Sequence, residues 1–342
     1  MSISVERNGF SNILQLGYQV VYDLVQSGGF QVVAVDKATT SGFSSINSHY
    51  VLKPLVESDP LADDLVQPWR LVLEFNNTAG YIKVWVCTPT QLDDSWNVGE
   101  YETDKEAGFL GVDNLHDSTA TFWSNDSTKT FWSCYKDQGI DPESIPLSYQ
   151  LNVTDHGVFF SLWAESFDKA GDCFCWFNIQ RPVDCDTGLI VSDGKAPLMC
   201  VFSRYGNSDA QKISDAPDDK VANSILYFTV RESDVNMPEP PRSAVVPVGD
   251  SYPIINPLQQ VAILEDGSYT VRFPQGFNTQ RYLYDYKLDM IAYTSADVLS
   301  QWSKPKFTVF GEETQRTYKA LNANFPNNSG MRVLCQIAGQ GF

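Results

Sequence analysis

Apolar and polar residues alternate along most of this chain with the two-residue period that is typical of half-buried β-strands. One segment departs from this pattern. Between Ser11 and Gln26, apolar residues recur three and four positions apart, which predicts a helix with Ser11 as its cap. Gly28-Gly29 follows directly and predicts where the helix ends. The pattern therefore predicts a single helix near the start of a strand-rich chain.

The strands expected in the first 237 residues are short and separated by Gly, Asn and Asp residues that favour turns. They are Phe30–Val35, Trp69–Phe75, Tyr81–Val86, Phe122-Trp123, Phe131-Trp132, Leu147–Val153, Val158–Trp163, Phe174–Ile179, Leu198–Phe202 and Ile225–Val230. Many short strands joined by such turns are typical of sandwiches and barrels. This part of the chain is therefore predicted to be β-rich and sandwich-like or barrel-like.

A proline-rich stretch interrupts the pattern, with six prolines between Pro238 and Pro257. Proline fixes φ and lacks a backbone N–H, so the stretch is expected to be neither a helix nor an interior strand. An extended connector fits this composition. The prediction divides the chain into a β-rich part over residues 1–237, a linker over 238–257 and a smaller part over 258–342.

The C-terminal part carries signals of both kinds of element. Asp266-Gly267 predicts a tight hairpin turn, and Thr294 is expected to cap a short helix. The expected elements are the strands Val261–Leu264, Tyr269–Phe273, Phe307–Phe310 and Val333–Ile337, and the helix Ser295–Trp302. The overall prediction is a mainly β fold, with a large β-rich N-terminal part containing one helix and a smaller α+β C-terminal module.

Charge narrows the range of partners. The 342 residues include 24 basic and 42 acidic ones, a formal net charge of −18, which disfavours binding to nucleic-acid phosphates. No apolar stretch approaches the roughly 20 residues needed to span a bilayer, so no membrane partner is expected. The N-terminus lacks the pattern of a secretory signal, which predicts synthesis in the cytoplasm.

No pattern of reactive residues predicts an active site. Cys173 and Cys175 are two apart in an expected strand, which suits buried thiols better than zinc ligands. His49, His116 and His156 stand in no metal-binding or catalytic frame, and phosphate-binding loops are absent. No catalytic residue, metal or cofactor is therefore assigned, and the chain is expected not to be an enzyme. A hydrolase that uses only carboxylates remains the least favoured alternative.

A series of tyrosines is the strongest candidate for a contact surface. Tyr282, Tyr284 and Tyr286 alternate with charged or polar residues, a pattern that fits an interface as well as a strand in the core. In a strand, the three would lie on one face. Together with Trp302 they are the candidate residues for a principal subunit contact, since tyrosine and tryptophan are enriched at binding hot spots.

Two segments resemble virion structural proteins of large tailed bacteriophages. Phe174–Ser203 carries the pattern IQRPVD…TG…GKAPL, and Asn278–Leu334 contains NTQRYLYDYKLDMIAYTSADVLSQW and NANFPNNSGMRVL. The resemblance covers about a third of the chain. It implies a non-enzymatic component of the contractile tail, baseplate or neck, made in the host cytoplasm and located in the virion. Its partners would be other virion structural proteins and copies of itself.

A second class of function stays open. Trp123, Trp132, Trp163 and Trp176 are close in sequence, and exposed tryptophans could stack on sugar rings. The alternative is therefore a carbohydrate- or receptor-binding module of a tail appendage. Fibre proteins of that kind usually contain repeats, and the sequence shows no convincing repeat.

Overall fold

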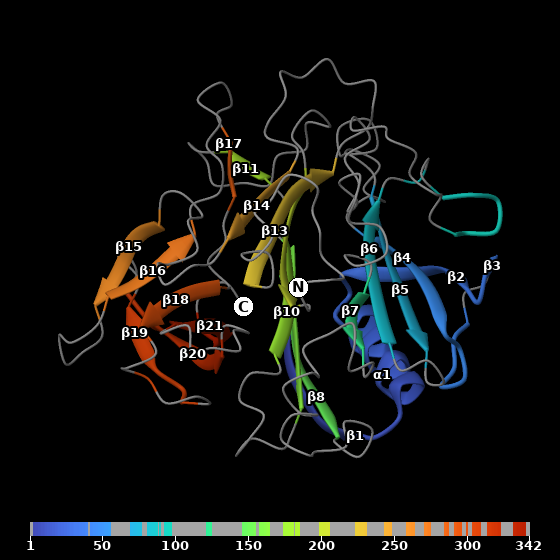
Figure 1. The fold of residues 1–342 in the computed structure, drawn as a ribbon, viewed down its shortest axis with the longest axis horizontal. Coiled ribbons are helices and arrows are strands. Elements are labelled where there is room, and N and C mark those ends of the chain that lie inside the picture. Colours follow the sequence, from blue (N-terminus) through green and yellow to red (C-terminus); the bar gives the residue numbers. More distant parts are fainter. Residues whose placement is uncertain are drawn as a thin grey trace.

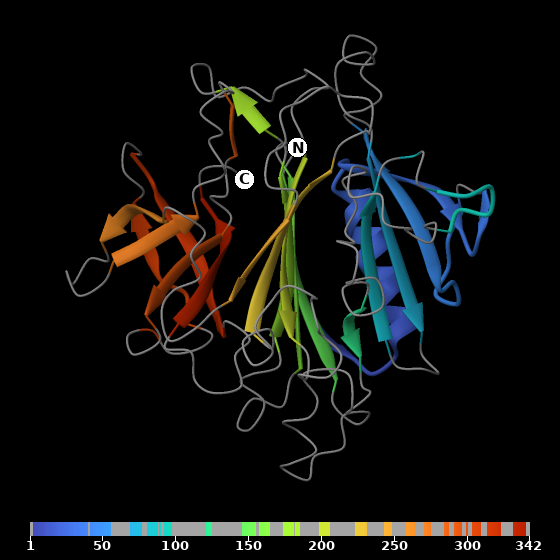
Figure 2. The ribbon, with the colours of Figure 1, turned by 45° about the horizontal axis from the view of Figure 1, so that its top comes forward.

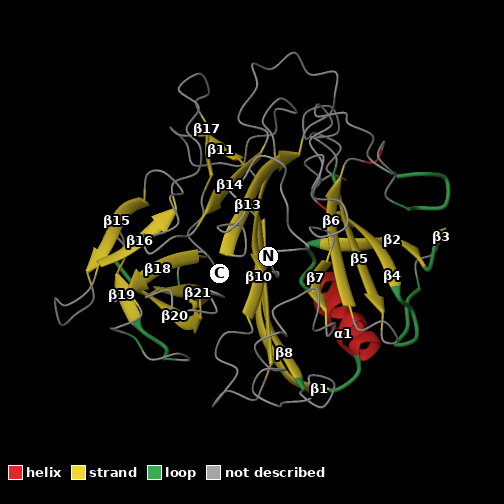
Figure 3. Ribbon diagram, viewed as in Figure 1, coloured by secondary structure: helices red, strands yellow, loops and turns green. Residues whose placement is uncertain are grey.

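The structure is a computed structural model, and most of its described residues lie in antiparallel strands. The described residues are 3–39, 42–55, 69–76, 81–87, 89, 92–97, 121–124, 146–154, 157–164, 174–180, 182–184, 198–205, 223–230, 243–247, 258–263, 270–274, 284–286, 291–295, 299, 303–308, 313–322 and 331–339. Within them there is one helix, α1 (Ile13–Gln26) (Figure 3). The predicted mainly β character with a single N-terminal helix is confirmed for this part of the chain.

Three large sheets organise the strands. The middle sheet has the order β1 (Ile3–Phe10), β8 (Leu147–Val153), β9 (Gly157–Ala164), β10 (Phe174–Gln180), β12 (Leu198–Tyr205), β13 (Asn223–Val230), β14 (Ser243–Pro247). The N-terminal sheet has the order β3 (Ala38–Thr39), β2 (Phe30–Val35), β4 (His49–Pro54), β5 (Arg70–Asn76), β6 (Tyr81–Cys87), β7 (Thr121–Ser124). Figures 1 and 2 show the middle sheet between the other two sheets.

The C-terminal sheet contains the last strands of the chain. Its order is β15 (Leu258–Ile263), β16 (Thr270–Pro274), β18 (Ile291–Ser295), β21 (Met331–Ala338), β20 (Gln315–Asn322), β19 (Lys306–Thr308). A two-stranded ribbon of β11 (Pro182–Asp184) and β17 (Tyr284–Tyr286) completes the described strands. The described pairings between these strands are antiparallel.

Helix α1 begins one residue later than the sequence predicted. The cap is Asn12, whose side-chain oxygen accepts hydrogen bonds from Leu14 N at 2.9 Å and Gln15 N at 3.1 Å. Both Ser11 and Asn12 are good cap residues by type, and the extended backbone of Asn12 decides between them. At the other end, Gly28 adopts a φ of +72° after the last helical residues, as the glycine pair predicted.

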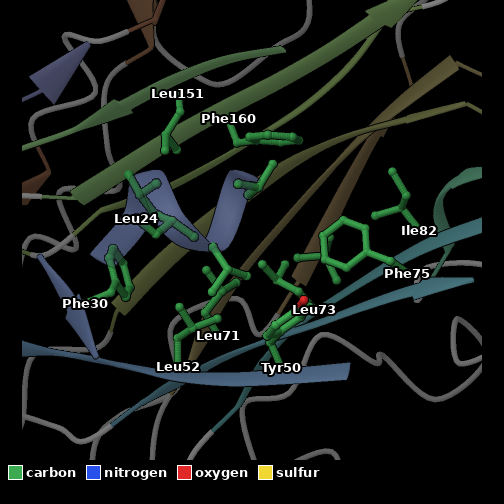
Figure 4. Packing of buried hydrophobic residues seen from close by; sticks show 14 of the residues in the cluster. Leu24, Phe30, Tyr50, Leu52, Leu71, Leu73, Phe75, Ile82, Leu151 and Phe160 are labelled. Atoms are coloured by element: carbon green, nitrogen blue, oxygen red, sulfur yellow. The ribbon is translucent and has the colours of Figure 1, made fainter. Parts of the chain in front are cut away.

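The main apolar core lies around α1, between the N-terminal sheet and the middle sheet. Figure 4 shows Leu24 of the helix with Leu151 and Phe160 on one side and Leu52 and Leu71 on the other. All of these side chains are buried. Burial of this kind contributes about 25 cal/mol per Å² of apolar surface, so α1 is held mainly by packing against both sheets.

The close approach of α1 to the N-terminal sheet depends on a glycine. A Cβ atom built at Gly17 would lie 2.5 Å from ring atoms of Phe75 on β5. Only a residue without a side chain allows the ring of Phe75 to pack directly on the helix backbone. Gly17, which weakens the helix signal in the sequence, is thus required by packing.

Two expectations for the C-terminal half need correction. The helix predicted over Ser295–Trp302 does not begin at its expected cap, because Thr294 and Ser295 are the last residues of β18, which pairs with β21. Leu299 lies in a bend, and the other positions of that helix are outside the described residues. The β-prone residues Ile291 and Tyr293, together with the pairing to β21, outweigh the weak capping signal.

The proline-rich stretch is not wholly a free connector. Ser243–Pro247 forms β14, which pairs with β13 over five positions at the edge of the middle sheet. An edge strand tolerates proline because the missing N–H faces away from the neighbouring strand. The described part of the linker is therefore a strand, and residues 238–242 and 248–257 lie outside the described residues.

In the part of the chain that the structure describes, no helix combines the length and the apolar character that crossing a membrane requires.

Candidate functional site

The predicted tyrosine candidates lie partly on a described strand. Tyr284 and Tyr286 are the first and last residues of β17, which pairs with β11 in the register Tyr284↔Asp184 and Tyr286↔Pro182. Tyr284–Tyr286 therefore has the extended backbone that the predicted alternation requires. Tyr282 and Trp302 lie outside the described residues.

The ribbon of β11 and β17 joins two segments that are far apart in sequence. β11 lies within Phe174–Ser203 and β17 within Asn278–Leu334, which are the two segments that carry the phage resemblance. Figure 1 shows the two strands side by side near the upper edge of the molecule. Three residues of each segment thus pair in one two-stranded ribbon.

A second group of polar side chains lies between the middle sheet and the C-terminal sheet. This polar layer consists of Ser4, Glu6, Gln150, Asn152, Arg316, Lys319 and Gln336. It exists because β8 is buried on both faces, with its odd-numbered residues in the apolar core and its even-numbered residues facing the other way. The contact between these two sheets is therefore polar.

Asn152 is the central hydrogen-bonding residue of the polar layer. Its Oδ1 accepts hydrogen bonds from Ser4 Oγ at 2.9 Å and from Gln150 Nε2 at 2.8 Å. Its Nδ2 donates to the backbone carbonyl of Gln336 on β21. Because Asn152 is fully buried, each of these partners compensates for water lost on folding.

An ion pair lies beside Asn152 in the polar layer. Lys319 Nζ on β20 lies 2.8 Å from Glu6 Oε1 on β1, and the side-chain exposures are 4% and 35%. Burial lowers the pKa of Lys319, and the carboxylate of Glu6 counteracts part of this effect. The pair links the first described strand of the chain to one of its last strands.

Cys335 is the described thiol that borders the polar layer. It is fully buried, and burial raises its pKa to about 12. A thiol with this pKa is protonated at neutral pH, so it is not an activated nucleophile. Cys335 is therefore a packing residue.

Asp23 forms a third polar cluster on the core side of α1. Its carboxylate accepts hydrogen bonds from Arg7 Nε at 3.0 Å, Arg7 Nη2 at 2.8 Å and Tyr149 Oη at 2.7 Å. The hydrogen bond to Asp23 raises the pKa of Arg7, and burial together with Asp23 raises the pKa of Tyr149. The three groups are mutually satisfied, which suits a link between β1, α1 and β8.

The β2–β3 turn holds a further carboxylate, Asp36. It accepts hydrogen bonds from the side chain of Asn47 and from the backbone N–H groups of Ser48 at 2.8 Å and His49 at 3.1 Å. Burial opposes ionisation of Asp36, but these hydrogen bonds outweigh it and lower its pKa. Asp36 and Lys37 both have positive φ, as a two-residue hairpin turn requires.

His49 lies beside this turn and is buried, with 5% of its surface exposed. Its Nδ1 has no hydrogen-bond partner among the described residues, and burial lowers its pKa. Among the described residues, no group of three or more His, Cys, Asp or Glu side chains has an arrangement that could hold a metal ion. The described polar clusters thus act as links between elements.

Sequence reasoning missed the polar layer, the Asp23 cluster and the hydrogen bonds around Asp36. Glu6 and Lys319 are far apart in the chain, and the charged residues of β20 indicate a solvated segment when only the local pattern is considered. Asp36 has a local signal, since Asp-Lys between apolar runs favours a turn. The chain matches no protein-family model and no curated protein.

Proposed function

We propose that this protein is a non-enzymatic structural component of a tailed-phage virion, in the contractile tail, baseplate or neck. It acts in assembly through contacts with other virion proteins and with copies of itself, not with nucleic acid or membranes. The observation that carries the proposal is the resemblance of Phe174–Ser203 and Asn278–Leu334 to phage virion structural proteins. The pairing of β11 with β17, which joins these two segments, supports it.

The use of polar side chains in the described residues supports the same proposal. Asp23, Asp36 and Lys319 each hold one element against another, and the thiol of Cys335 is buried and protonated. Such links make a strand-rich subunit more rigid, which suits a role in assembly. We further propose that residues 258–342 form a separate assembly module, and that residues 1–237 form the sandwich-like β-rich part.

The sugar-binding alternative rests on Trp123, Trp132, Trp163 and Trp176, whose side chains lie outside those that the structure describes, so it stays the second candidate function. Two other tryptophans have described side chains. Trp69 is buried, with 3% exposed, and Trp96 packs against the apolar cluster of Ala34, Val51 and Val72. The indole N–H of Trp96 donates to Thr39 Oγ1 at 3.2 Å. Sugar rings stack on an exposed indole face, and these two side chains are used in packing.

A nonsense mutation in the gene, introduced into the phage that encodes it, tests the proposal. Lysates grown without a suppressor should contain particles that lack the tail, or tails that fail to join heads, as seen by negative-stain electron microscopy. A suppressor host should restore complete particles and serves as the control. Complete, infectious particles in the non-suppressing host would contradict the proposal.

A further inference from the structure

Three side chains of the polar layer have the chemical groups that a new amide bond requires: an amine, a primary amide and a carboxylate. The amine is Lys319 on β20, the amide is Asn152 on β8 and the carboxylate is Glu6 on β1. An amine that attacks a primary amide displaces its nitrogen, and a carboxylate can move the protons that this exchange requires. Whether the three groups can react with one another depends on where the fold places them.

The three groups lie around the side chain of Cys335 on β21. Lys319 and Cys335 are directly opposed in the pairing of β20 with β21, so their side chains lie on one face of the C-terminal sheet. Asn152 Nδ2 lies 3.7 Å from Cys335 Sγ. Glu6 Oε1 lies 2.8 Å from Lys319 Nζ, and the charges of both groups act on the pKa of Cys335. The amine, the amide and the carboxylate therefore border the same buried side chain.

The hydrogen bonds of Asn152 favour attack at its carbonyl carbon, Cγ. Oδ1 accepts hydrogen bonds from Ser4 Oγ at 2.9 Å and from Gln150 Nε2 at 2.8 Å. Negative charge develops on this oxygen when an amine adds to Cγ, and donors that are already in place stabilise it. Nδ2, the nitrogen that leaves, is held separately by the backbone carbonyl of Gln336. The amide is thus both polarised and oriented by its neighbours.

Burial makes the amine of Lys319 more reactive than that of a lysine in water. Its side chain is 4% exposed, and burial outweighs the opposing charge of Glu6 and lowers its pKa. A lower pKa increases the fraction of neutral amine, whose lone pair can attack a carbonyl carbon. Glu6 lies within hydrogen-bond distance of Nζ and its side chain is 35% exposed, so it can accept protons and also reach solvent.

We propose that Lys319 and Asn152 form an isopeptide bond, with Glu6 as the general acid and base. The lone pair of Nζ forms the bond to Cγ of Asn152, and the bond between Cγ and Nδ2 breaks. Lys319 loses two of its three ammonium protons, Glu6 passes both to Nδ2, and this nitrogen leaves as an ammonium ion. Glu6 is ionised at the end as at the start, and the reaction needs no oxidant, reductant or cofactor.

The bond joins β8 of the middle sheet to β20 of the C-terminal sheet. It closes a loop over residues 152–319, and a covalent cross-link of this kind stabilises a protein chiefly by limiting the unfolded chain. The reaction requires only the folded chain. The inference therefore goes beyond the proposed function and does not depend on it.

Intact-mass spectrometry of the purified full-length chain under reducing conditions tests the proposal. After incubation at neutral pH, the wild-type protein should have lost the mass of one ammonia relative to its sequence. Trypsin does not cleave after an acylated lysine, so the digest should contain residues 137–169 joined to residues 317–332. Fragmentation of this linked peptide should place the bond between Asn152 and Lys319.

Three variants separate the roles of the side chains. Lys319→Arg removes the nucleophile but keeps the positive charge, so this variant should retain its full mass. Glu6→Gln keeps a polar side chain of the same size that cannot carry protons, so bond formation should slow by about a hundredfold or more. Lys306→Arg is the matched control at an exposed lysine of β19 and should form the bond as the wild type does. Circular dichroism verifies that each variant is folded.

A wild-type chain that retains its full mass would overturn the inference. So would a loss of ammonia with the two peptides unlinked, because an asparagine also loses ammonia when it closes a cyclic imide with the backbone. A bond from Lys319 to Gln150 or Gln336 would contradict the assignment of Asn152, and an unchanged rate in Glu6→Gln would contradict the role of Glu6. None of these results bears on whether the protein is present in virions, which particle analysis tests separately.

Discussion

At the scale of single residues, buried polar groups decide where elements meet. Asp23 is 2% exposed, yet it accepts three hydrogen bonds from Arg7 and Tyr149, so its charge is compensated. His49 is buried with less compensation, since its Nδ1 has no partner among the described residues. Protonation of His49 would place a positive charge in this buried position, which burial disfavours.

His49 makes stability depend on pH. Burial lowers the pKa of His49 in the folded protein, while the unfolded chain takes up its proton at about pH 6.5. Its contribution to stability is therefore complete above about pH 6.5 and is lost as the pH falls through the folded pKa. Denaturant unfolding between about pH 7.5 and pH 5.5 should show this loss in the wild type and a smaller loss in His49→Gln.

His49→Gln retains a polar side chain of similar reach, so its stability above about pH 7 sets the baseline for the comparison. Other groups that titrate in this range affect both proteins equally. An identical decrease of the free energy of unfolding in wild type and variant would show that His49 is not the titrating group.

At the scale of elements, alternation in the sequence predicted many of the described strands but missed others, including β4 and β20. Phe30–Val35 agrees with β2 at both ends, and Leu147–Val153 agrees with β8. β20 was missed because Arg316 and Lys319 occupy buried positions of a strand whose partners are distant in sequence. The helix was found from its apolar spacing, although its cap is Asn12.

Gly17 tests the packing of α1 on the N-terminal sheet. In an exposed helix, replacing glycine with alanine stabilises by about 1 kcal/mol. At Gly17 the new methyl group would meet the buried ring of Phe75, so Gly17→Ala should instead destabilise by about 1–3 kcal/mol. Chemical denaturation measures this, and Gln15→Ala on the exposed side of α1 is the matched control.

The double variant Gly17→Ala/Phe75→Leu separates overpacking from other causes. A smaller side chain at position 75 relieves the clash, so the double variant should lose less stability than the sum of the two single changes. If Gly17→Ala stabilises the protein, α1 does not approach β5 as closely as described.

The second element to test is β17. The triple variant Tyr282→Ala/Tyr284→Ala/Tyr286→Ala removes aromatic groups whose truncation typically costs more than about 2 kcal/mol at a true contact. The expected result is protein that folds, as judged by circular dichroism, but enters particles poorly. The matched control is Gln31→Ala at an exposed position of β2, which leaves this segment intact. Incorporation equal to wild type would place the main subunit contact elsewhere.

At the scale of the whole molecule, the middle sheet joins an apolar layer on one face to a polar layer on the other. The apolar layer follows from alternation and is predictable, whereas the polar layer depends on contacts such as Glu6–Lys319 that no local pattern indicates. For the tyrosine candidates, the sequence predicted an extended segment but not its partner strand. The pairing of Tyr284 with Asp184 joins residues that are far apart in the sequence.

Lys319 tests whether the polar layer couples the two ends of the chain. Lys319→Ala removes the partner of Glu6 and should lower the free energy of unfolding by about 1–3 kcal/mol, reduced from a fully buried pair because Glu6 is partly exposed. Hydrogen exchange should accelerate in both β1 and β20. Lys306→Ala, at an exposed lysine of β19, is the control. Acceleration confined to the C-terminal strands would show that the sheets are not coupled.

The central claim is that the protein is a stoichiometric part of a phage particle, and quantitative mass spectrometry of purified virions tests it most directly. Particles should be purified through successive density gradients, with host proteins as the measure of contamination. The account predicts peptides from both 1–237 and 258–342 at a constant ratio to the major tail proteins through every gradient step. A chain that is absent, or that decreases in parallel with the host proteins, would contradict it.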